Sequence, residues 1–266
     1  MMQTVHNTIR AYWHELADAM EAMPFALVSQ AATALLNCHQ HGGVIFLVGN
    51  GGSAATASHF ACDLAKGTRG PDGRPTLRVM ALTDNVPLLT AWGNDTSYDR
   101  VFAEQLTALA HTGDTLVAIS ASGNSPNVLA CVEAARQHGM TVIALTGQTG
   151  GKLRALADLA ICVPSPSIEQ VEDAHLMIAH SICVALRHEL ARHAATTAQD
   201  TVVYSYGGYA EYVPERTSGA LAPASELLTA TGRRRSPRSR RSAHILNEKE
   251  PLPLDLDVAS EQTAVG

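Results

Sequence analysis

The sequence predicts an α/β protein built on a parallel five-stranded sheet flanked by helices. Two observations lead to this fold class: short, continuously apolar runs recur along the chain, and helical patterns separate several of them. Strands that are apolar throughout are typical of a parallel sheet covered on both faces. Aromatic residues make up only 5% of the 266 residues, which favours a helix-rich α/β protein over a β-sandwich.

The elements follow one another in a regular order. Residues 5–39 carry apolar side chains at three- and four-residue steps, and Pro24 is expected to divide this stretch into two helices. Five apolar runs are predicted as strands: 43–49, 77–82, 115–120, 141–145 and 159–163. Helical patterns follow the first, third and fifth of these runs, at residues 53–64, 125–138 and 169–193.

The character of the chain changes after residue 195. We therefore predict one domain over residues 1–195, followed by a mostly disordered tail over 196–266, which is rich in Ser, Thr, Pro, Gly and Arg. Within the tail, residues 202–206 have the composition of a short strand. The basic run at 232–241 is a candidate contact for an acidic partner, although a solvated tail is the favoured interpretation.

Charge and cysteine usage narrow the class of protein. The formal net charge is −6, which gives no reason to expect nucleic acid as a partner of the core. The N-terminus lacks the pattern of a signal peptide, and no apolar run has the length of a membrane span. The cysteines are odd in number, scattered and without a CxxC pair: Cys38, Cys62, Cys131, Cys162 and Cys183. We expect reduced core thiols and a cytoplasmic protein.

The first loop of chemical interest lies between a predicted strand and a predicted helix, and reads Gly49-Asn-Gly51-Gly52-Ser53. Glycines let the backbone approach a ligand closely, and the N–H groups that open a helix favour an anion. A tight turn without a ligand is the alternative interpretation, and the glycines alone do not decide between the two.

The second loop, Ser120-Ala-Ser122-Gly-Asn-Ser125-Pro126, also joins a strand to a helix. Ser125 is expected at the N-cap with Pro126 behind it, but capping does not explain the other two hydroxyls. The loop has neither the lysine of a Walker motif nor the spacing of a dinucleotide fingerprint. Because parallel strands bind ligands at their carboxyl ends, both loops belong on one side of the sheet, where they predict a site for a phosphate monoester.

These loops carry a resemblance to a known family. The segments GNGGSA, HFACDL, SASGNSPNV and ALTG resemble the sugar-isomerase (SIS) domain, which is a flavodoxin-like three-layer sandwich. With AWGND at 91–95 and the pattern from Glu172 to His180, the chain resembles the phosphoheptose isomerases over residues 5–195. Those enzymes interconvert sedoheptulose 7-phosphate and D-glycero-D-manno-heptose 7-phosphate. The resemblance also implies a homotetramer with sites between subunits.

The resemblance implies a set of site residues. The serines Ser53, Ser120, Ser122 and Ser125 would hold the phosphate. The first loop would be shaped by Asn50, Gly51 and Gly52, and Asp95 would contact the sugar hydroxyls. Glu172 stands where the family usually has Gln, and Asp63 stands where it has Glu, whereas His59 and His180 match the family. The two departures leave open an isomerase for a different sugar phosphate.

The residues themselves allow more than one interpretation. His59 and Asp63 are four apart and share one helix face, so both can reach one metal ion or one substrate, or they form a plain surface pair. His180 lies in an apolar helix, where a lone histidine is more often a satisfied core residue. Eight residues separate it from Glu172, about 12 Å of helical rise, so one chain or two could bring them to one ion.

Aldose–ketose isomerisation needs a base and a group that stabilises the enediolate oxygen. We expect Asp63 to be the base and His180 to exchange protons with the sugar oxygens. A zinc ion held by His59, Asp63, Glu172 and His180 would be electrically neutral and would polarise the carbonyl. As a zinc ligand, however, Asp63 would be a poorer free base. The alternative function is a non-catalytic SIS protein that senses a sugar phosphate or docks a replication-initiator partner.

Overall fold

The computed structural model describes residues 2–70 and 76–199. The chain divides into one unit from Met1 to Ser205 and a second from Tyr206 to Gly266, and the second lies outside the described residues. The strand expected at 202–206, the basic run at 232–241 and the disorder expected beyond residue 199 therefore also lie outside them.

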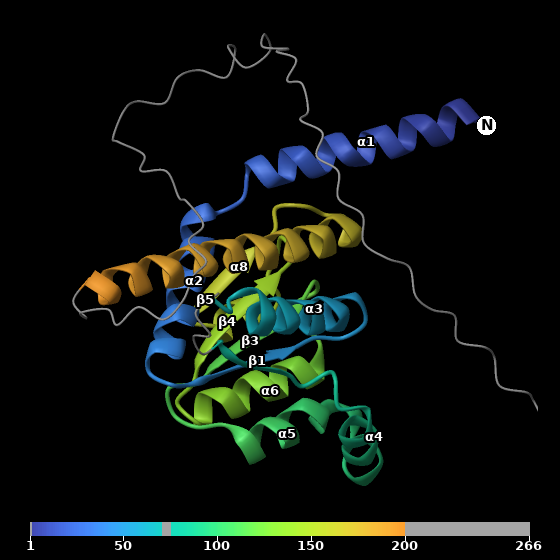
Figure 1. Ribbon diagram of the computed structural model, residues 1–266. Coiled ribbons are helices and arrows are strands. Elements are labelled where there is room, and N and C mark those ends of the chain that lie inside the picture. Colours follow the sequence, from blue (N-terminus) through green and yellow to red (C-terminus); the bar gives the residue numbers. More distant parts are fainter. Residues whose placement is uncertain (1, 71–75, 200–266) are drawn as a thin grey trace, which may run out of the picture. The chain divides into compact units, whose positions relative to one another are not determined.

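A parallel five-stranded sheet in the order β2-β1-β3-β4-β5 runs through the described residues (Figure 1). Its strands are β1 (Val44–Val48), β2 (Arg78–Ala81), β3 (Thr115–Ser120), β4 (Thr141–Thr146) and β5 (Leu159–Cys162). All five agree with the predicted strands to within one residue at each end. This order is that of flavodoxin-like folds, so the predicted fold class is confirmed.

Helices cover both faces of the sheet (Figure 1). One face carries α2 (Phe25–Gln40), α3 (Gly52–Gly67) and α8 (Ile168–Gln199), with α1 (Met2–Glu21) lying against α8. The other face carries α5 (Val101–Leu109), α6 (Pro126–Gln137) and α7 (Leu153–Leu156), with α4 (Val86–Asp95) and the 3-10 turn η1 (Tyr98–Arg100) beside α5.

The strand β1 shows why the core has two halves. Its side chains alternate between faces, so Ile45 and Leu47 pack beneath α2, α3 and α8, whereas Phe46 and Val48 pack beneath α5 and α6. All four are almost fully buried. The unbroken apolar run in the sequence therefore reflects burial on both faces, as expected of a parallel sheet.

The N-terminal helical stretch breaks where proline predicts. Helix α1 ends at Glu21, Pro24 occupies the N-cap position of α2, and the two helix axes differ by 69°. Among the described residues no single helix is long and apolar enough to cross a membrane. Only this bent pair, taken together, has the length and composition to do so.

Three features differ from the expectations. Cys62 lies on the exposed side of α3 and is not a core residue, whereas Cys38, Cys131 and Cys183 are buried and Cys162 is half-buried. Helix α8 continues to Gln199 and so passes the predicted domain boundary at residue 195. The helices α4, α5 and α7 were not predicted, because each is short, with ten, nine and four residues.

Candidate active site

The two predicted loops meet at the point where the strand order reverses. Strands β1 and β3 are neighbours, and the helices that follow them leave the sheet in different directions. Ligands of open α/β sheets bind in the crevice at such a point. A cavity of about 150 Å³ lies there, and its lining contains all four predicted phosphate serines. The lining residues are Asn50, Ser53, Ile119, Ser120, Ala121, Ser122, Ser125, Ile168 and Glu172.

The first loop is tightly wound. Gly51 adopts φ 54°, a conformation that favours glycine, and α3 begins at the next residue. A Cβ at Gly49 would lie 2.6 Å from the backbone of Ser53, so this turn is closed too tightly for a side chain. Ser53 is buried in the first turn of α3. The local sequence therefore brings a hydroxyl and a helix N-terminus to the cavity wall.

The second loop presents its hydroxyls to the same cavity. Ser125 occupies the N-cap position of α6, as predicted, but in the described part of the chain its side chain does not cap that helix. Its Oγ lies 3.1 Å from Oγ of Ser120 instead, with either oxygen able to donate. Ser122 Oγ accepts from the Asn124 amide at 3.2 Å. Ser120 and Ser125 thus hold each other on the cavity wall, and Ser122 lines the same cavity.

Asn50 uses its side chain for contacts within the protein. Its Nδ2 donates to Asn127 Oδ1 at 2.8 Å, and its Oδ1 accepts from Asn127 Nδ2 at 2.9 Å. The Tyr98 hydroxyl donates to the same Oδ1 at 3.2 Å. Asn50 thus joins the first loop to Asn127 and Tyr98, and its loop-shaping role stays a prediction. Neither Asn127 nor Tyr98 was predicted as a site residue, although Asn127 stands within the SASGNSPNV segment.

Glu172 belongs to the cavity and lies apart from the predicted metal ligands. Its carboxylate lies against Gly52, so closely that a Cβ there would collide with it. Glu172 therefore brings a negative charge to the N-terminus of α3, inside the predicted phosphate site. The physical reason for its separation from His180 is the eight-residue spacing, which corresponds to about 12 Å of rise along α8.

The other three predicted ligands converge. His59 Nε2 lies 3.0 Å from His180 Nε2 and 3.3 Å from Asp63 Oδ2, and His180 Nε2 lies 3.5 Å from the same oxygen. His59 and Asp63 share one face of α3, and His180 reaches them from α8. About half of each imidazole is exposed, so the cluster lies at the surface of the single chain.

The donor atoms of this cluster are of the kinds that bind zinc. Two imidazole nitrogens and a carboxylate oxygen, all within 4.8 Å of one another, form a three-ligand set of the kind that catalytic zinc sites use. A tetrahedral zinc with bonds of about 2.05 Å would separate its ligand atoms by about 3.3 Å, close to the distances observed. Cys183 lies behind the cluster, where burial and the Asp63 carboxylate raise the pKa of its thiol to about 12, so this sulfur stays neutral.

Helices α3 and α8 run side by side in the same direction, and this arrangement connects the cavity to the cluster. Gly52 contacts Glu172 near the start of both helices, and His59 contacts His180 about two turns further along. The cluster therefore lies along the helix pair from the cavity, about 9 Å of rise beyond Ser53 at His59.

Two residues of the sequence pattern lie outside these groups. Asp95 ends α4, where its Oδ1 accepts from Asn94, and it is not part of the cavity lining. His175 is buried on α8, where its Nε2 lies 3.2 Å from the Thr146 carbonyl oxygen, while its Nδ1 has no partner among the described residues. Burial lowers the pKa of His175 to about 4, so the ring is neutral near pH 7.

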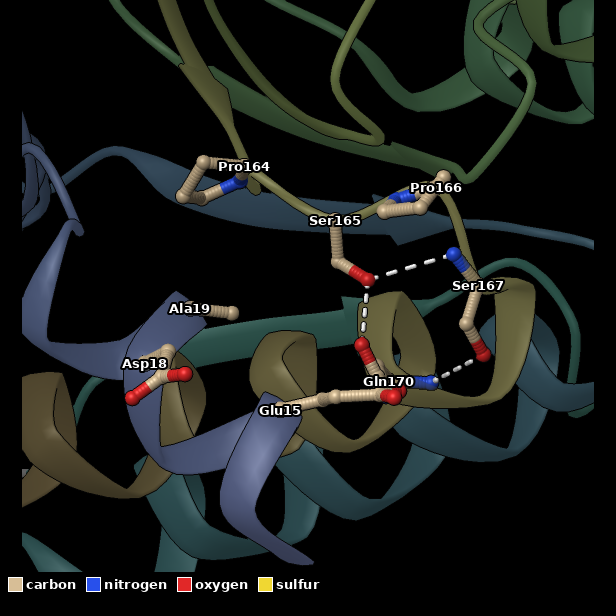
Figure 2. Close-up of a pocket in the computed structure, with 8 residues that line it drawn as sticks. All are labelled: Glu15, Asp18, Ala19, Pro164, Ser165, Pro166, Ser167 and Gln170. Carbon is tan, nitrogen blue, oxygen red and sulfur yellow. Dashed lines mark hydrogen bonds between the residues drawn. The ribbon is translucent and has the colours of Figure 1, made fainter. Parts of the chain in front are cut away.

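A separate hollow of about 410 Å³ lies between α1 and the start of α8 (Figure 2). Its polar groups satisfy one another: Ser165 Oγ donates to Gln170 Oε1, and Gln170 Nε2 donates to Glu15 at 3.0 Å. None of the predicted site residues lines it. The hollow therefore offers no alternative to the cavity at the switch point.

Comparisons with known proteins agree with the fold. The SIS domain family matches residues 9–147. The phosphoheptose isomerase of Neisseria gonorrhoeae is 40% identical over 188 residues, which are 68% of this chain and 94% of that protein. The phosphoheptose isomerase of Thiobacillus denitrificans is 44% identical over 172 residues, covering 64% of this chain and 86% of its own length.

Solved structures show the same relationship. The phosphoheptose isomerase GmhA from Neisseria gonorrhoeae matches with a TM-score of 0.64 and 38% identity, covering 68% of this chain and 98% of that one. A phosphoheptose isomerase from Francisella tularensis matches with a TM-score of 0.65 and 33% identity, covering 70% of this chain and 98% of that one. The chain therefore belongs to the SIS-domain family and, within it, to the phosphoheptose isomerases, which makes it a sugar-phosphate isomerase.

Proposed function

We propose that the chain interconverts sedoheptulose 7-phosphate and D-glycero-D-manno-heptose 7-phosphate by proton transfer through an enediolate. The observation that carries this proposal is the pairing of a serine-lined cavity with a His–Asp–His cluster along two parallel helices. The phosphate would occupy the cavity, where hydroxyls and the N-termini of α3 and α6 favour an anion. The sugar chain would then extend along the helix pair toward His59 and His180.

The distance between the serine-lined cavity and the His–Asp–His cluster favours a substrate with a long sugar chain. Ser53 and His59 are six residues apart on α3, about 9 Å of rise. An extended seven-carbon chain, with bonds of about 1.5 Å, spans roughly 10 Å from its terminal phosphate to C1. A phosphate held by Ser53 therefore brings C1 and C2 of a heptose near the cluster, whereas a triose phosphate would fall well short.

We assign the proton transfer to Asp63 and His180. Asp63 Oδ2 lies within 3.5 Å of both imidazoles, so they can orient the carboxylate toward a substrate proton between C1 and C2. His180 would exchange protons with the sugar oxygens that change their bonding. Zinc held by His59, Asp63 and His180 would supply Lewis acidity to the carbonyl. Glu172 and Asp95 stay predicted substrate contacts.

A homotetramer is also part of the proposal. The exposed apolar residues Val5, Ile9 and Trp13 recur at four-residue steps and form one face of α1, with Trp13 65% exposed. Such a face is suited to packing against another copy of the chain. Light scattering on the purified protein tests the tetramer. A monomeric, active protein would contradict it. The cytoplasmic location stays a prediction.

The decisive experiment is an isomerase assay of the purified protein on a panel of ketose phosphates, combined with metal analysis. We expect turnover of sedoheptulose 7-phosphate and loss of turnover on chelation, restored by zinc. Full activity of metal-free protein would contradict the metal role. Activity on another sugar alone would change the substrate, and inactivity with every sugar and metal would favour the non-catalytic alternative.

Variants separate the two roles of Asp63. Replacing Asp63 by Asn should lower kcat by a factor of about 10² to 10⁴, the range typical of a lost general base. His59→Ala should lower zinc content as well as kcat. If Asp63→Asn keeps its zinc, the carboxylate acts as the base; if zinc is lost, it acts as a ligand. Asp18→Asn, on the exposed side of α1, is the matched control.

A further inference from the structure

We propose that Asn127 is a positioning residue of the phosphate site, holding the first loop in register with the second. This inference rests on the proposed phosphate-binding role of the cavity. Asn127 does not line that cavity, so it acts through Asn50, which does. The two asparagines are 77 residues apart in the chain and exchange two hydrogen bonds, one in each direction.

Asn127 is fixed within its own helix. It is the second residue of α6, after Pro126, and only 2% of it is exposed. Its Oδ1 accepts from the Val128 backbone amide at 2.9 Å as well as from Asn50. The side chain therefore has one arrangement that satisfies both its amide nitrogen and its oxygen, and this arrangement requires Asn50 opposite it.

Asn50 transmits this constraint to α3. Its backbone carbonyl accepts from the Ala54 amide at 3.2 Å, within the first turn of that helix. One residue is thus bound to the start of α3 through its backbone and to the start of α6 through its side chain. Because Ser53 belongs to α3 and Ser125 directly precedes α6, the amide pair sets the spacing of the hydroxyls across the cavity.

If the two loops shift, the serine-lined cavity binds the phosphate less tightly in the substrate and in the transition state alike. Loss of such uniform binding raises KM and leaves kcat nearly unchanged. A buried amide with a purely structural role would lower stability without this pattern. A rise of KM without a change of kcat therefore distinguishes a positioning role from a purely structural one.

The test uses the full-length Asn127→Leu variant, which has a similar side-chain volume and no hydrogen bonds. We expect the KM for sedoheptulose 7-phosphate to rise about tenfold or more, with kcat changed less than about threefold, as for a lost buried hydrogen-bonded pair. The inhibition constant of inorganic phosphate, which probes the cavity alone, should rise by the same factor as KM. Unchanged constants in folded Asn127→Leu would overturn the inference.

The matched control is Gln105→Met. Gln105 is also a buried amide with two hydrogen bonds, to the carbonyls of Leu82 and Val101, but it lies away from the cavity. We expect this variant to lose thermal stability and to keep its KM and its inhibition constant for phosphate. If KM rose equally in Asn127→Leu and Gln105→Met, the effect of Asn127 would be explained by general destabilisation, and the inference would be overturned.

A double-mutant cycle tests that Asn127 acts through Asn50. Asn50→Ala and Asn127→Ala should each raise KM, and the double variant should resemble either single one; additive effects would contradict the coupling.

A second variant covers the case in which Asn127→Leu does not fold. Asn127→Asp keeps the two hydrogen bonds that Oδ1 accepts and replaces only the donor, and it should still raise both the KM and the inhibition constant of phosphate. A wild-type enzyme that turns over the sugar without being inhibited by inorganic phosphate would overturn the phosphate site itself.

Discussion

At the scale of single residues, Glu172 brings a carboxylate to the cavity, at a position where the family resemblance leads us to expect glutamine. A carboxylate in a cavity built from hydroxyls and helix N-termini occupies a position that suits an anion, and a bound phosphate would share that position with it. Its charge therefore opposes the charge of the substrate. The metal cluster is distant along the helix, so the first effect of this substitution falls on binding.

We predict that Glu172→Gln lowers the KM for the sugar phosphate. Removing one negative charge near the phosphate should strengthen binding about threefold to tenfold, the scale of ~1 kcal/mol for unit charges a few ångströms apart in water. Steady-state kinetics at low ionic strength measure the change. Glu169→Gln, one turn earlier on α8, is the control. A raised KM would show instead that Glu172 binds the sugar hydroxyls.

A second prediction concerns His175 and the pH dependence of stability. The pKa of this ring falls from 6.5 to about 4 on burial, so below pH 6.5 the unfolded chain binds a proton that the folded chain does not. Stability is therefore fully present above about pH 6.5 and is lost as the pH falls toward 4. The loss amounts to about 3 kcal/mol, at 1.36 kcal/mol for each unit of pKa.

Urea unfolding of the wild type and of His175→Gln between pH 7.5 and pH 4.5 measures this effect. Other acidic and basic groups titrate alike in the two proteins, so the difference between their curves isolates the histidine. We expect the variant to lose less stability over that range. Parallel curves would show that the ring is protonated in the folded state or does not unfold with the core.

At the scale of elements, the turn between β3 and α6 depends on one glycine. Gly123 has φ 63°, and a Cβ there would overlap the carbonyl oxygen of Gly150 in the turn after β4. Gly42, before β1, has a similar φ of 75° and open space around it. Both positions need a left-handed backbone, but only at Gly123 would a Cβ meet another part of the backbone.

We predict that Gly123→Ala is far more harmful than Gly42→Ala. At Gly42 the cost is that of the left-handed backbone alone, about 1 kcal/mol. At Gly123 the two turns must also separate, which should cost several kcal/mol more and raise the KM by moving the serines. Thermal unfolding and steady-state kinetics measure both effects. Equal losses of stability in the two variants would contradict the close approach of the turns.

The elements also show how much could be predicted from the sequence. The central strands β1, β3 and β4 were predicted because both of their faces are covered, which leaves a continuous apolar run. The edge strands β2 and β5 are only partly buried, but their sequences are still mostly apolar. Helix α4 was missed because it is short and none of its residues is fully buried, although Leu89 and Trp92 pack partly against the core. The serines of the cavity were predicted from their loops. The Asn50–Asn127 pair could not be, because a contact between residues 77 apart leaves no local pattern.

At the scale of the whole molecule, the part that matches the isomerases is shorter than the chain. The 188 residues aligned with the Neisseria gonorrhoeae relative account for 94% of that protein but 68% of this one. The last predicted site residue, His180, precedes the end of α8 at Gln199 by several turns. Every group assigned to binding and proton transfer therefore precedes the end of α8.

We predict that truncation after Gln199 leaves kcat/KM within about twofold of the full chain, because no buried core residue of the described part is removed. Truncation after Ala185 is the contrasting variant, since it removes the buried Leu186 and should yield insoluble protein. Activity assays and unfolding curves compare the three proteins. Loss of activity in the first truncation would show that residues 200–266 take part in function.

The parallel course of α3 and α8 has a consequence for how such an enzyme evolves. The proposed phosphate anchor is formed by loops at strand ends, whereas the His–Asp–His cluster comes from helix faces two turns further along. Substitutions on those faces can alter which carbon atoms react, or the metal preference, without disturbing the anchor. An exchange at Asp63, where the family resemblance leads us to expect glutamate, can therefore become established while the proposed phosphate-binding loops stay intact.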